Sequence, residues 1–271
     1  MTRIREKFKE LKEKGKAALV IYLTAGDPSL EATADIIFEL EKNGADIIEL
    51  GVPFSDPMAD GPTIQLSSER ALKNGTTLTG VLDILRKIRE KSEIPVIIFG
   101  YYNPFLSYGL KKFAEDAHYA GADGVLVVDL PPEEADEFKI YTDEAGLDLV
   151  FLLAPTSTSE RIKIVSERAR GFVYLVSITG VTGERPTMDY SLESLVRTIK
   201  NHTRLPVGIG FGVSTPDQTQ KIANFADAVI VGSAFIRIIE KYGHNGKQLF
   251  KEISAFIKLL SQACKKTAIH S

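Results

Sequence analysis

Two acidic residues, Glu49 and Asp60, have the side-chain types and the placement for acid–base chemistry. Glu49 lies within a short apolar run, Ile47–Leu50, and Asp60 follows eleven positions later. Prolines and glycines between Gly51 and Pro62 exclude regular helix or strand there, so Asp60 lies in a constrained loop. A pair of carboxylates drawn towards an apolar pocket indicates acid–base catalysis, because their charged forms lose hydration there. The alternative is that these acids are solvated or cap helices.

The elements that would position this pair are eight short apolar runs, which alternate with longer amphipathic stretches. Each run is rich in Val, Ile and Leu and too short for a helix, which favours buried parallel strands. The runs are Ala18–Thr24, Ile47–Leu50, Val96–Gly100, Gly124–Val128, Asp148–Leu153, Phe172–Val176, Val207–Gly210 and Ala228–Val231. Strand–helix units repeated eight times predict a closed (β/α)8 TIM barrel, with residues 1–271 forming a single domain. An open doubly wound sheet is the structural alternative.

Helix-start signals mark several of the segments between these runs. Ser157 and Glu160 form a capping-box pattern ahead of a helix predicted over Arg161–Arg168. Thr215 followed by Pro216 is an N-cap with proline at the first helical position.

Two further helices are predicted outside the repeating units. The first residues of the chain carry Ile4, Phe8 and Leu11 at helical spacing among charged residues. We expect this N-terminal helix to cover the floor of the barrel. A last helix is predicted over Ser254–Ala263.

In a TIM barrel the chemistry is expected where strands end and the following loops begin. No lysine lies in the eight runs or at the starts of these loops, so no Schiff-base candidate is present. The single cysteine, Cys264, excludes an internal disulfide. The four histidines lie in helical or terminal stretches, which disfavours a histidine-based metal site: His118, His202, His244 and His270. We therefore predict carboxylate chemistry without a metal, led by Glu49 and Asp60, with Asp129 and Asp27 as lesser candidates.

Glycines gather at the ends of the last three predicted strands. They are Gly180 and Gly183, then Gly210 and Gly212, then Gly232 followed by Ser233. Glycine lets the backbone approach an anion closely, and a helix that starts at Ala234 would point free N–H groups at it. Barrels often bind phosphate at this corner. The alternative is that the glycines serve only tight turns.

Composition sets limits on partners and location. The chain has 271 residues, 44% of them hydrophobic, and a formal net charge of −3. This balance gives no reason to expect nucleic acid or a membrane as a partner. No secretory signal is visible and no apolar run approaches the roughly 20 residues that span a bilayer, so a cytoplasmic protein is expected.

The segment from Glu49 to Gln65, together with shorter motifs in the same order, resembles the α subunit of tryptophan synthase. The shorter motifs are Thr24–Pro28, Tyr102–Pro104, Gly180–Gly183, Gly210–Gly212 and Val231–Ala234. The resemblance implies a lyase of L-tryptophan biosynthesis that cleaves indole-3-glycerol phosphate to indole and D-glyceraldehyde 3-phosphate. It also implies a tryptophan synthase β subunit as partner in an α2β2 tetramer. Pyridoxal phosphate is then expected only in that partner, and this chain needs no cofactor.

The same resemblance implies roles for individual residues. Glu49 would shuttle the proton, and Asp60 would stabilise charge on the indole nitrogen. The phosphate would be held by Gly183, Phe211, Gly212, Gly232 and Ser233. The indole would be lined by Tyr22, Ile64, Phe99 and Tyr174, with Thr182 in a lid that contacts Asp60 on closure. Tyr22 departs from the family, which has phenylalanine there.

The partner surface is expected on two proline-bearing segments, Pro53–Asp56 and Tyr101–Phe105, both facing outwards. Its residues would include Pro53, Asp56, Tyr102 and Asn103. Three other functions remain open at this point: a lyase that acts without a β subunit, a non-catalytic barrel that activates a partner, and a sugar-phosphate isomerase barrel.

Overall fold

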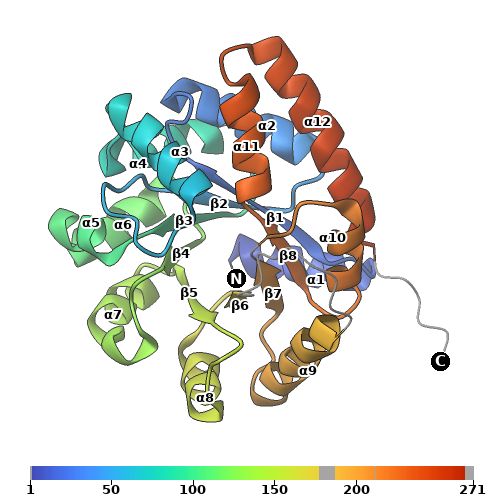
Figure 1. The fold of residues 1–271 in the computed structure, drawn as a ribbon. Coiled ribbons are helices and arrows are strands. Elements are labelled where there is room, and N and C mark those ends of the chain that lie inside the picture. The colour runs from blue at the N-terminus through green and yellow to red at the C-terminus, as the bar shows by residue number, and fades with distance from the viewer. Residues whose placement is uncertain (1, 177–186, 211, 266–271) are drawn as a thin grey trace.

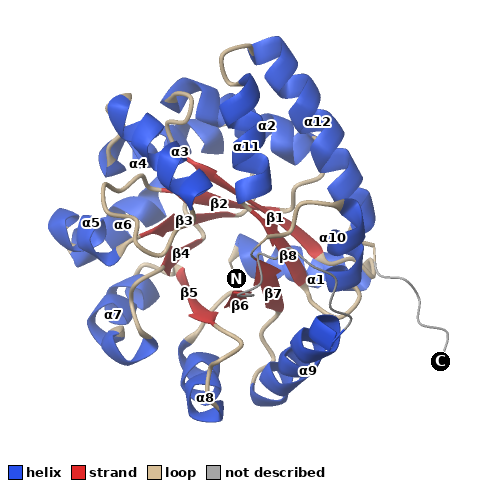
Figure 2. Cartoon of the chain, in the orientation of Figure 1, coloured by secondary structure: helices blue, strands red, loops and turns tan. Residues whose placement is uncertain are grey.

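The fold is a closed barrel of eight parallel strands surrounded by helices (Figures 1 and 2). A computed structural model describes residues 2–176, 187–210 and 212–265. The strands pair in chain order and β1 closes the ring against β8. They are β1 Ala18–Thr24, β2 Ile47–Gly51, β3 Val96–Gly100, β4 Gly124–Val127, β5 Asp148–Leu153, β6 Val173–Val176, β7 Val207–Gly210 and β8 Ala228–Val231. The prediction of a TIM barrel is confirmed, and the open sheet is excluded.

Helices in the described residues surround the barrel, the first across its floor and the others as an outer layer, with one short 3₁₀ turn at Pro132–Glu134. They are α1 Arg3–Glu13, α2 Leu30–Lys42, α3 Pro62–Lys73, α4 Leu78–Arg89, α5 Tyr102–Tyr108, α6 Leu110–Ala120, α7 Asp136–Glu144, α8 Ser159–Arg168, α9 Thr187–His202, α10 Pro216–Ala223, α11 Ser233–Tyr242 and α12 Gly246–Ala263. None of them is long and apolar enough to cross a bilayer.

Side chains along each strand alternate between the barrel interior and the helical layer. On β1, Leu19 and Ile21 belong to the core under the helices, whereas Val20 belongs to the core inside the barrel. Both faces are therefore buried, which explains why the strands appear in the sequence as continuous apolar runs. Pairing of Tyr22 with Glu49 across β1 and β2 places these two inward residues at the same height.

The N-terminal helix α1 closes the floor of the barrel, as the sequence predicts. Ile4, Phe8 and Leu11 are buried in the same core as inward strand residues such as Val20. Arg3 also donates to Asp123 at 3.1 Å, at the start of β4. The barrel interior is therefore filled from below, and a cavity can open only towards the carboxyl ends of the strands.

Two helix starts differ from the sequence prediction. The N-cap of α8 is Thr158, whose hydroxyl accepts from Arg161 N at 3.2 Å. Ser157 instead accepts from Ala154 N at 2.9 Å, so it closes the preceding turn and the predicted capping box is wrong. The last helix begins earlier than predicted because Asn245 caps Gln248 N and starts α12 at Gly246.

Other boundaries agree more closely. The N-cap of α10 is Thr215, and it forms a capping box with Gln218. Helix α11 begins at Ser233, one residue before the predicted start. This shift puts the Ser233 side chain on the first turn of α11, directly after β8.

Candidate active site

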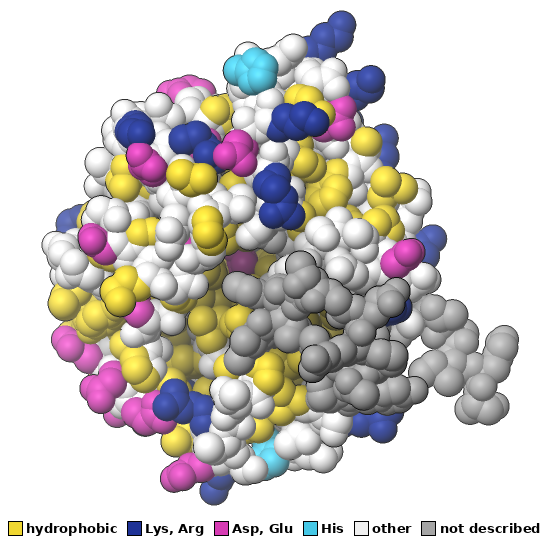
Figure 3. Space-filling model, viewed as in Figure 1, with side chains coloured by type: hydrophobic (Ala, Val, Ile, Leu, Met, Phe, Trp, Pro, Cys, Tyr) yellow, Lys and Arg dark blue, Asp and Glu magenta, His cyan; other side chains and the backbone are white. Residues whose placement is uncertain are grey.

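A cavity of about 340 Å³ opens at the carboxyl ends of the strands. Figure 3 shows this face of the molecule hollowed near its centre, with hydrophobic side chains around the hollow. The residues that line the cavity are Tyr22, Glu49, Ala59, Asp60, Gly61, Pro62, Thr63, Ile64, Phe99, Val128, Leu152, Tyr174, Val176, Gly212, Val213, Ile230, Gly232, Ser233, Ala234 and Arg237. A mostly apolar lining with a few polar groups is typical of a small-molecule site.

Glu49 is held inside the barrel by β2 and its side chain enters the cavity. The residue is 1% exposed, and its Oε1 atom has no hydrogen-bond partner among the described residues. Burial disfavours the charged carboxylate and raises the pKa of Glu49 to about 8. Glu49 is therefore protonated at neutral pH and can give a proton to a bound molecule.

Asp60 reaches the same cavity from the loop between β2 and α3. Its Oδ2 accepts a hydrogen bond from the Tyr101 hydroxyl at 3.0 Å, and Gln65 Nε2 holds its backbone carbonyl at 2.9 Å. Burial raises the pKa of Asp60 to about 6, and the Tyr101 bond limits the rise. At neutral pH Asp60 is ionised while Glu49 is protonated, so the two acids have opposite roles in proton transfer.

Aromatic rings form one wall of the cavity. Tyr22 and Phe99 meet edge to face with ring centroids 5.0 Å apart, and Tyr174 and Ile64 line the same space. The four residues predicted for an indole slot therefore lie together. A flat apolar ring fits such a wall, because aromatic pairs favour edge-to-face and offset contacts.

The hydroxyl of Tyr22 has a partner although it is buried. It lies 3.3 Å from Thr24 Oγ1, within the strand that carries both residues. Space for it comes from Gly51, where a Cβ atom would lie 2.4 Å from the hydroxyl oxygen. Burial, with the nearby acids Asp60 and Glu49, raises the pKa of Tyr22, so the phenol stays neutral.

The glycine corner is described only in part. Gly212, Gly232 and Ser233 line the cavity, and Gly212 has a φ of 78°, which favours glycine. Ser233 opens α11, whose first N–H groups are not used within the helix. Gly183, Phe211 and Thr182 lie outside the described residues, so their predicted roles in phosphate binding and in a lid remain predictions.

The two lesser carboxylate candidates do not line the cavity. Asp27 accepts two hydrogen bonds from Arg70, at 2.9 and 2.7 Å, and one from Ser67. Asp129 accepts from the backbone N–H of Tyr102 at 2.7 Å. Both carboxylates hold loops in place.

The segments expected to face outwards do so only in part. Asp56 and Asn103 are exposed and Tyr102 is half-buried. Pro53 is buried, as are Tyr101 and Phe105, so the expectation of an outward face is wrong for these three. Tyr101 turns inwards to bond Asp60, and Phe105 stacks on Phe113. The partner-surface role of Asp56, Tyr102 and Asn103 remains a prediction.

Sequence reasoning missed several lining residues. Val128 and Leu152 continue the inward alternation at the ends of their strands, a period-two pattern that could have identified them. Arg237 also lines the cavity, and its position one helical turn after Ser233 was the available signal. No cluster of three or more potential metal ligands occurs within the described ranges.

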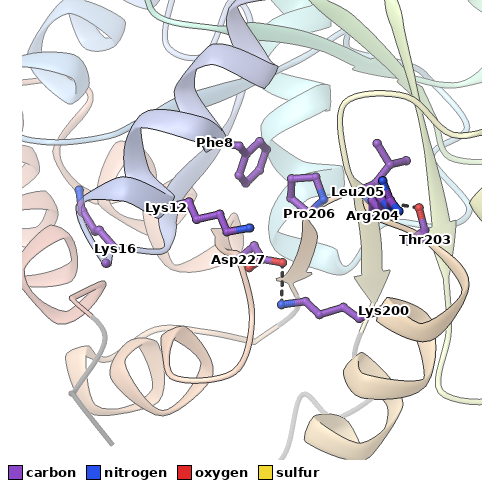
Figure 4. Close-up of a pocket in the computed structure, with 10 residues that line it drawn as sticks. Phe8, Lys12, Lys16, Lys200, Thr203, Arg204, Leu205, Pro206 and Asp227 are labelled. Carbon is purple, nitrogen blue, oxygen red and sulfur yellow. Dashed lines mark hydrogen bonds and ion pairs between the residues drawn. The ribbon is translucent and has the colours of Figure 1, made fainter.

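A second hollow, of about 600 Å³, lies at the opposite end of the barrel, beside α1 (Figure 4). Its lining is rich in cationic side chains, and Lys200 bonds Asp227 at 2.8 Å. The cationic residues there are Lys12, Lys16, Lys200 and Arg204. This hollow shares no residue with the cavity that holds Glu49 and Asp60.

Comparison with known proteins gives one family. The family model for the tryptophan synthase alpha chain matches residues 8–265. The tryptophan synthase alpha chain of Geobacter sulfurreducens is 54% identical over 263 residues, covering 97% of this chain and 99% of the relative. That of Thermoanaerobacter pseudethanolicus is 46% identical over 262 residues, covering 97% and 99%. The crystal structure of tryptophan synthase subunit alpha from Legionella pneumophila has a TM-score of 0.91 at 40% identity, covering 97% of this chain and 98% of that one. With this sequence identity, this fold and two carboxylates in one cavity, the chain belongs to the tryptophan synthase alpha chain family.

Proposed function

We propose that this chain is the lyase of the tryptophan synthase α reaction, in L-tryptophan biosynthesis. It cleaves indole-3-glycerol phosphate to indole and D-glyceraldehyde 3-phosphate by a retro-aldol step. Family membership supports this function, and so does the content of the cavity, which combines a proton donor, an anionic acceptor and an aromatic wall.

The observation that carries the mechanism is the contrast between the two carboxyl groups in one cavity. Protonated Glu49, with a pKa of about 8, gives its proton to C3 of the indole ring. The ring nitrogen then carries positive charge, and ionised Asp60 accepts its N–H and stabilises that charge.

The second half of the step returns the proton. The Glu49 carboxylate takes the proton of the hydroxyl on the carbon attached to the ring. The electron pair of the O–H bond becomes the aldehyde C=O, and the C–C bond breaks with its pair returning to the ring. The products are indole and D-glyceraldehyde 3-phosphate, and Glu49 is protonated again. No oxidant, reductant or water enters the balance.

A β subunit is the partner that family membership implies, and we propose an α2β2 assembly in which pyridoxal phosphate is bound only by that β subunit. Asp56, on the loop after β2, and Asn103, in the first turn of α5, are exposed at the cavity end of the barrel, where a partner could reach both these segments and the product. Size-exclusion chromatography with light scattering, on the chain mixed with a β subunit, tests the stoichiometry.

The activity is tested by indole release from indole-3-glycerol phosphate, with and without a β subunit. Glu49→Gln should lower kcat by about a hundredfold to ten-thousandfold, because the amide cannot donate and take back a proton. Its affinity for inorganic phosphate should stay unchanged. A Glu49→Gln variant with normal kcat would exclude the proposed proton shuttle. Wild-type protein without indole release under either condition would favour the non-catalytic barrel, and full activity without a β subunit would favour the stand-alone lyase.

A further inference from the structure

Arg237 has an exposed side chain that lines the cavity, and it has no part in the mechanism above. It is the one cationic residue among the described residues that line the cavity, which also holds two acids, Glu49 and Asp60. A phosphorylated substrate that enters beside ionised Asp60 needs a compensating positive charge, because like charges in a partly desolvated site repel.

Arg237 lies on α11, the helix that begins at the glycine corner. Ser233 and Arg237 are four residues apart, so their side chains lie on one face of the helix, and both line the cavity. The carbonyl of Gly232 already accepts from Phe235 N at 2.8 Å and Ile236 N at 3.1 Å. The N–H groups of Ser233 and Ala234 precede these and have no acceptor among the described residues, which suits an anion at this point.

The guanidinium of Arg237 is also uncommitted within the described chain. Arg70 provides the contrast, because it is bound bidentately by Asp27 and lies 3.7 Å from Glu240. No carboxylate of the described residues lies within ion-pair distance of Arg237, although α11 also carries Glu240. An unpaired guanidinium at the edge of a cavity can donate two parallel hydrogen bonds to two oxygens of a phosphate.

We propose that Arg237 binds the phosphate group of the substrate and supplies its counter-charge, and so sets the preference of the cavity for a phosphorylated side chain. This proposal rests on the proposed function for the identity of the substrate, and on the cavity alone for the binding of phosphate. Arg237 touches the part of the substrate that does not react. Its contribution is therefore to binding, and it appears in KM and leaves kcat unchanged.

The experiment compares three variants of the full chain with wild type. Arg237→Gln removes the charge, Arg237→Lys keeps the charge without the bidentate fork, and Arg204→Gln removes a matched charge from the hollow at the other end of the barrel. Inorganic phosphate binding is measured by titration calorimetry, and KM and kcat for indole-3-glycerol phosphate are measured at low and high salt.

The expected result is a rise of about tenfold in KM and in the phosphate Kd for Arg237→Gln, with kcat within about twofold. Arg237→Lys should recover part of the loss. Arg204→Gln should match wild type. The difference between wild type and Arg237→Gln should shrink at high salt, because ions screen an exposed charge.

Two results would overturn the proposal. One is equal phosphate Kd values for wild type, Arg237→Gln and Arg204→Gln. The other is an equal loss in both glutamine variants, which would show a general effect of net charge. Both leave the proposed function standing if wild type still releases indole. Absence of indole release with normal, Arg237-dependent phosphate binding would instead reject the function and retain the binding role.

Discussion

The hydroxyl of Tyr101 donates a hydrogen bond to Asp60 Oδ2 at 3.0 Å and accepts one from the backbone N–H of Ala59 at 3.0 Å. One phenol therefore holds both the acidic side chain and the backbone of the loop that carries it. Tyr101 follows β3 and is 4% exposed, so it anchors the loop between β2 and α3 to the barrel.

Tyr101→Phe should lower kcat/KM by about tenfold, since a hydrogen bond to a charged group contributes about 1.5 kcal/mol or more. The bond also lowers the pKa of Asp60, so its loss should move the acidic limb of the pH–rate profile upwards. Tyr108→Phe is a matched control, because the Tyr108 hydroxyl bonds Asp116 at 2.6 Å and does not line the cavity. An acidic limb that stays in place in Tyr101→Phe would contradict the positioning role.

The pH dependence of kcat/KM should be bell-shaped, with limbs near 6 and 8. Activity requires ionised Asp60, whose pKa is about 6, and protonated Glu49, whose pKa is about 8. Rates fall below the first value as Asp60 gains a proton and above the second as Glu49 loses one. Steady-state rates from pH 5 to pH 9.5 give the profile. Activity that keeps rising above pH 9 would show that protonated Glu49 is not required.

Glu49→Gln should stabilise the fold at alkaline pH. The ordinary pKa of 4.5 is raised to about 8 by burial, so ionisation of Glu49 opposes folding. The stability that comes from protonation of Glu49 in the folded state is fully present below about pH 4.5 and is lost as pH rises to about 8. The glutamine variant does not titrate, so its advantage should open between these values and reach a few kcal/mol, at about 1.4 kcal/mol per pKa unit.

Urea unfolding at pH 5, 7 and 8.5 measures this advantage. Glu69→Gln is the control, because Glu69 is a surface residue paired with Lys73, and the pairing lowers its pKa. It should show no gain that grows with pH. An advantage of Glu49→Gln that is constant across the three pH values would mean that Glu49 does not titrate with a raised pKa in the fold.

Gly51→Ala should both destabilise the protein and disturb the aromatic wall. The added Cβ would lie 2.4 Å from the Tyr22 hydroxyl oxygen and 2.8 Å from Tyr22 Cζ, so the ring must shift. Overpacking of this kind costs about 1–3 kcal/mol. KM should rise because Tyr22 lines the cavity.

Thermal unfolding of Gly51→Ala is compared with Gly61→Ala, where a Cβ would meet nothing within 4 Å. Equal melting temperatures for the two variants would contradict the close packing at Gly51.

Most of the fold follows from patterns that the sequence states directly. The inward and outward alternation on β1, where Val20 and Leu19 face different cores, makes the strand apolar throughout and easy to recognise. The cap of α8 was not predictable in the same way, because Ser157 and Thr158 are both good caps. Only the turn bond from Ala154 to Ser157 decides between them, and that bond depends on the path of the chain.

The residues of the candidate site likewise fall into those that local sequence patterns identify and those that depend on tertiary contacts. Glu49 and Asp60 could be identified from their place near the end of one strand and in the loop that follows it, but Asp27 also follows a strand. What separates them is Arg70, from a helix far along the chain, which binds Asp27 and removes it from chemistry. Similarly, Pro53 looks like a surface proline until the fold buries it. Long-range pairing and burial are tertiary properties, and local spacing does not encode them.

Helix α1 acts as a stopper beneath the barrel, with Ile4, Phe8 and Leu11 packed against the inward residues of the strands. Because the barrel is closed at this end, substrate and product can enter and leave the cavity only at the carboxyl ends of the strands. Any protein bound over that opening would therefore control both substrate entry and product exit. A small apolar product could then pass directly to that protein before it reaches bulk water.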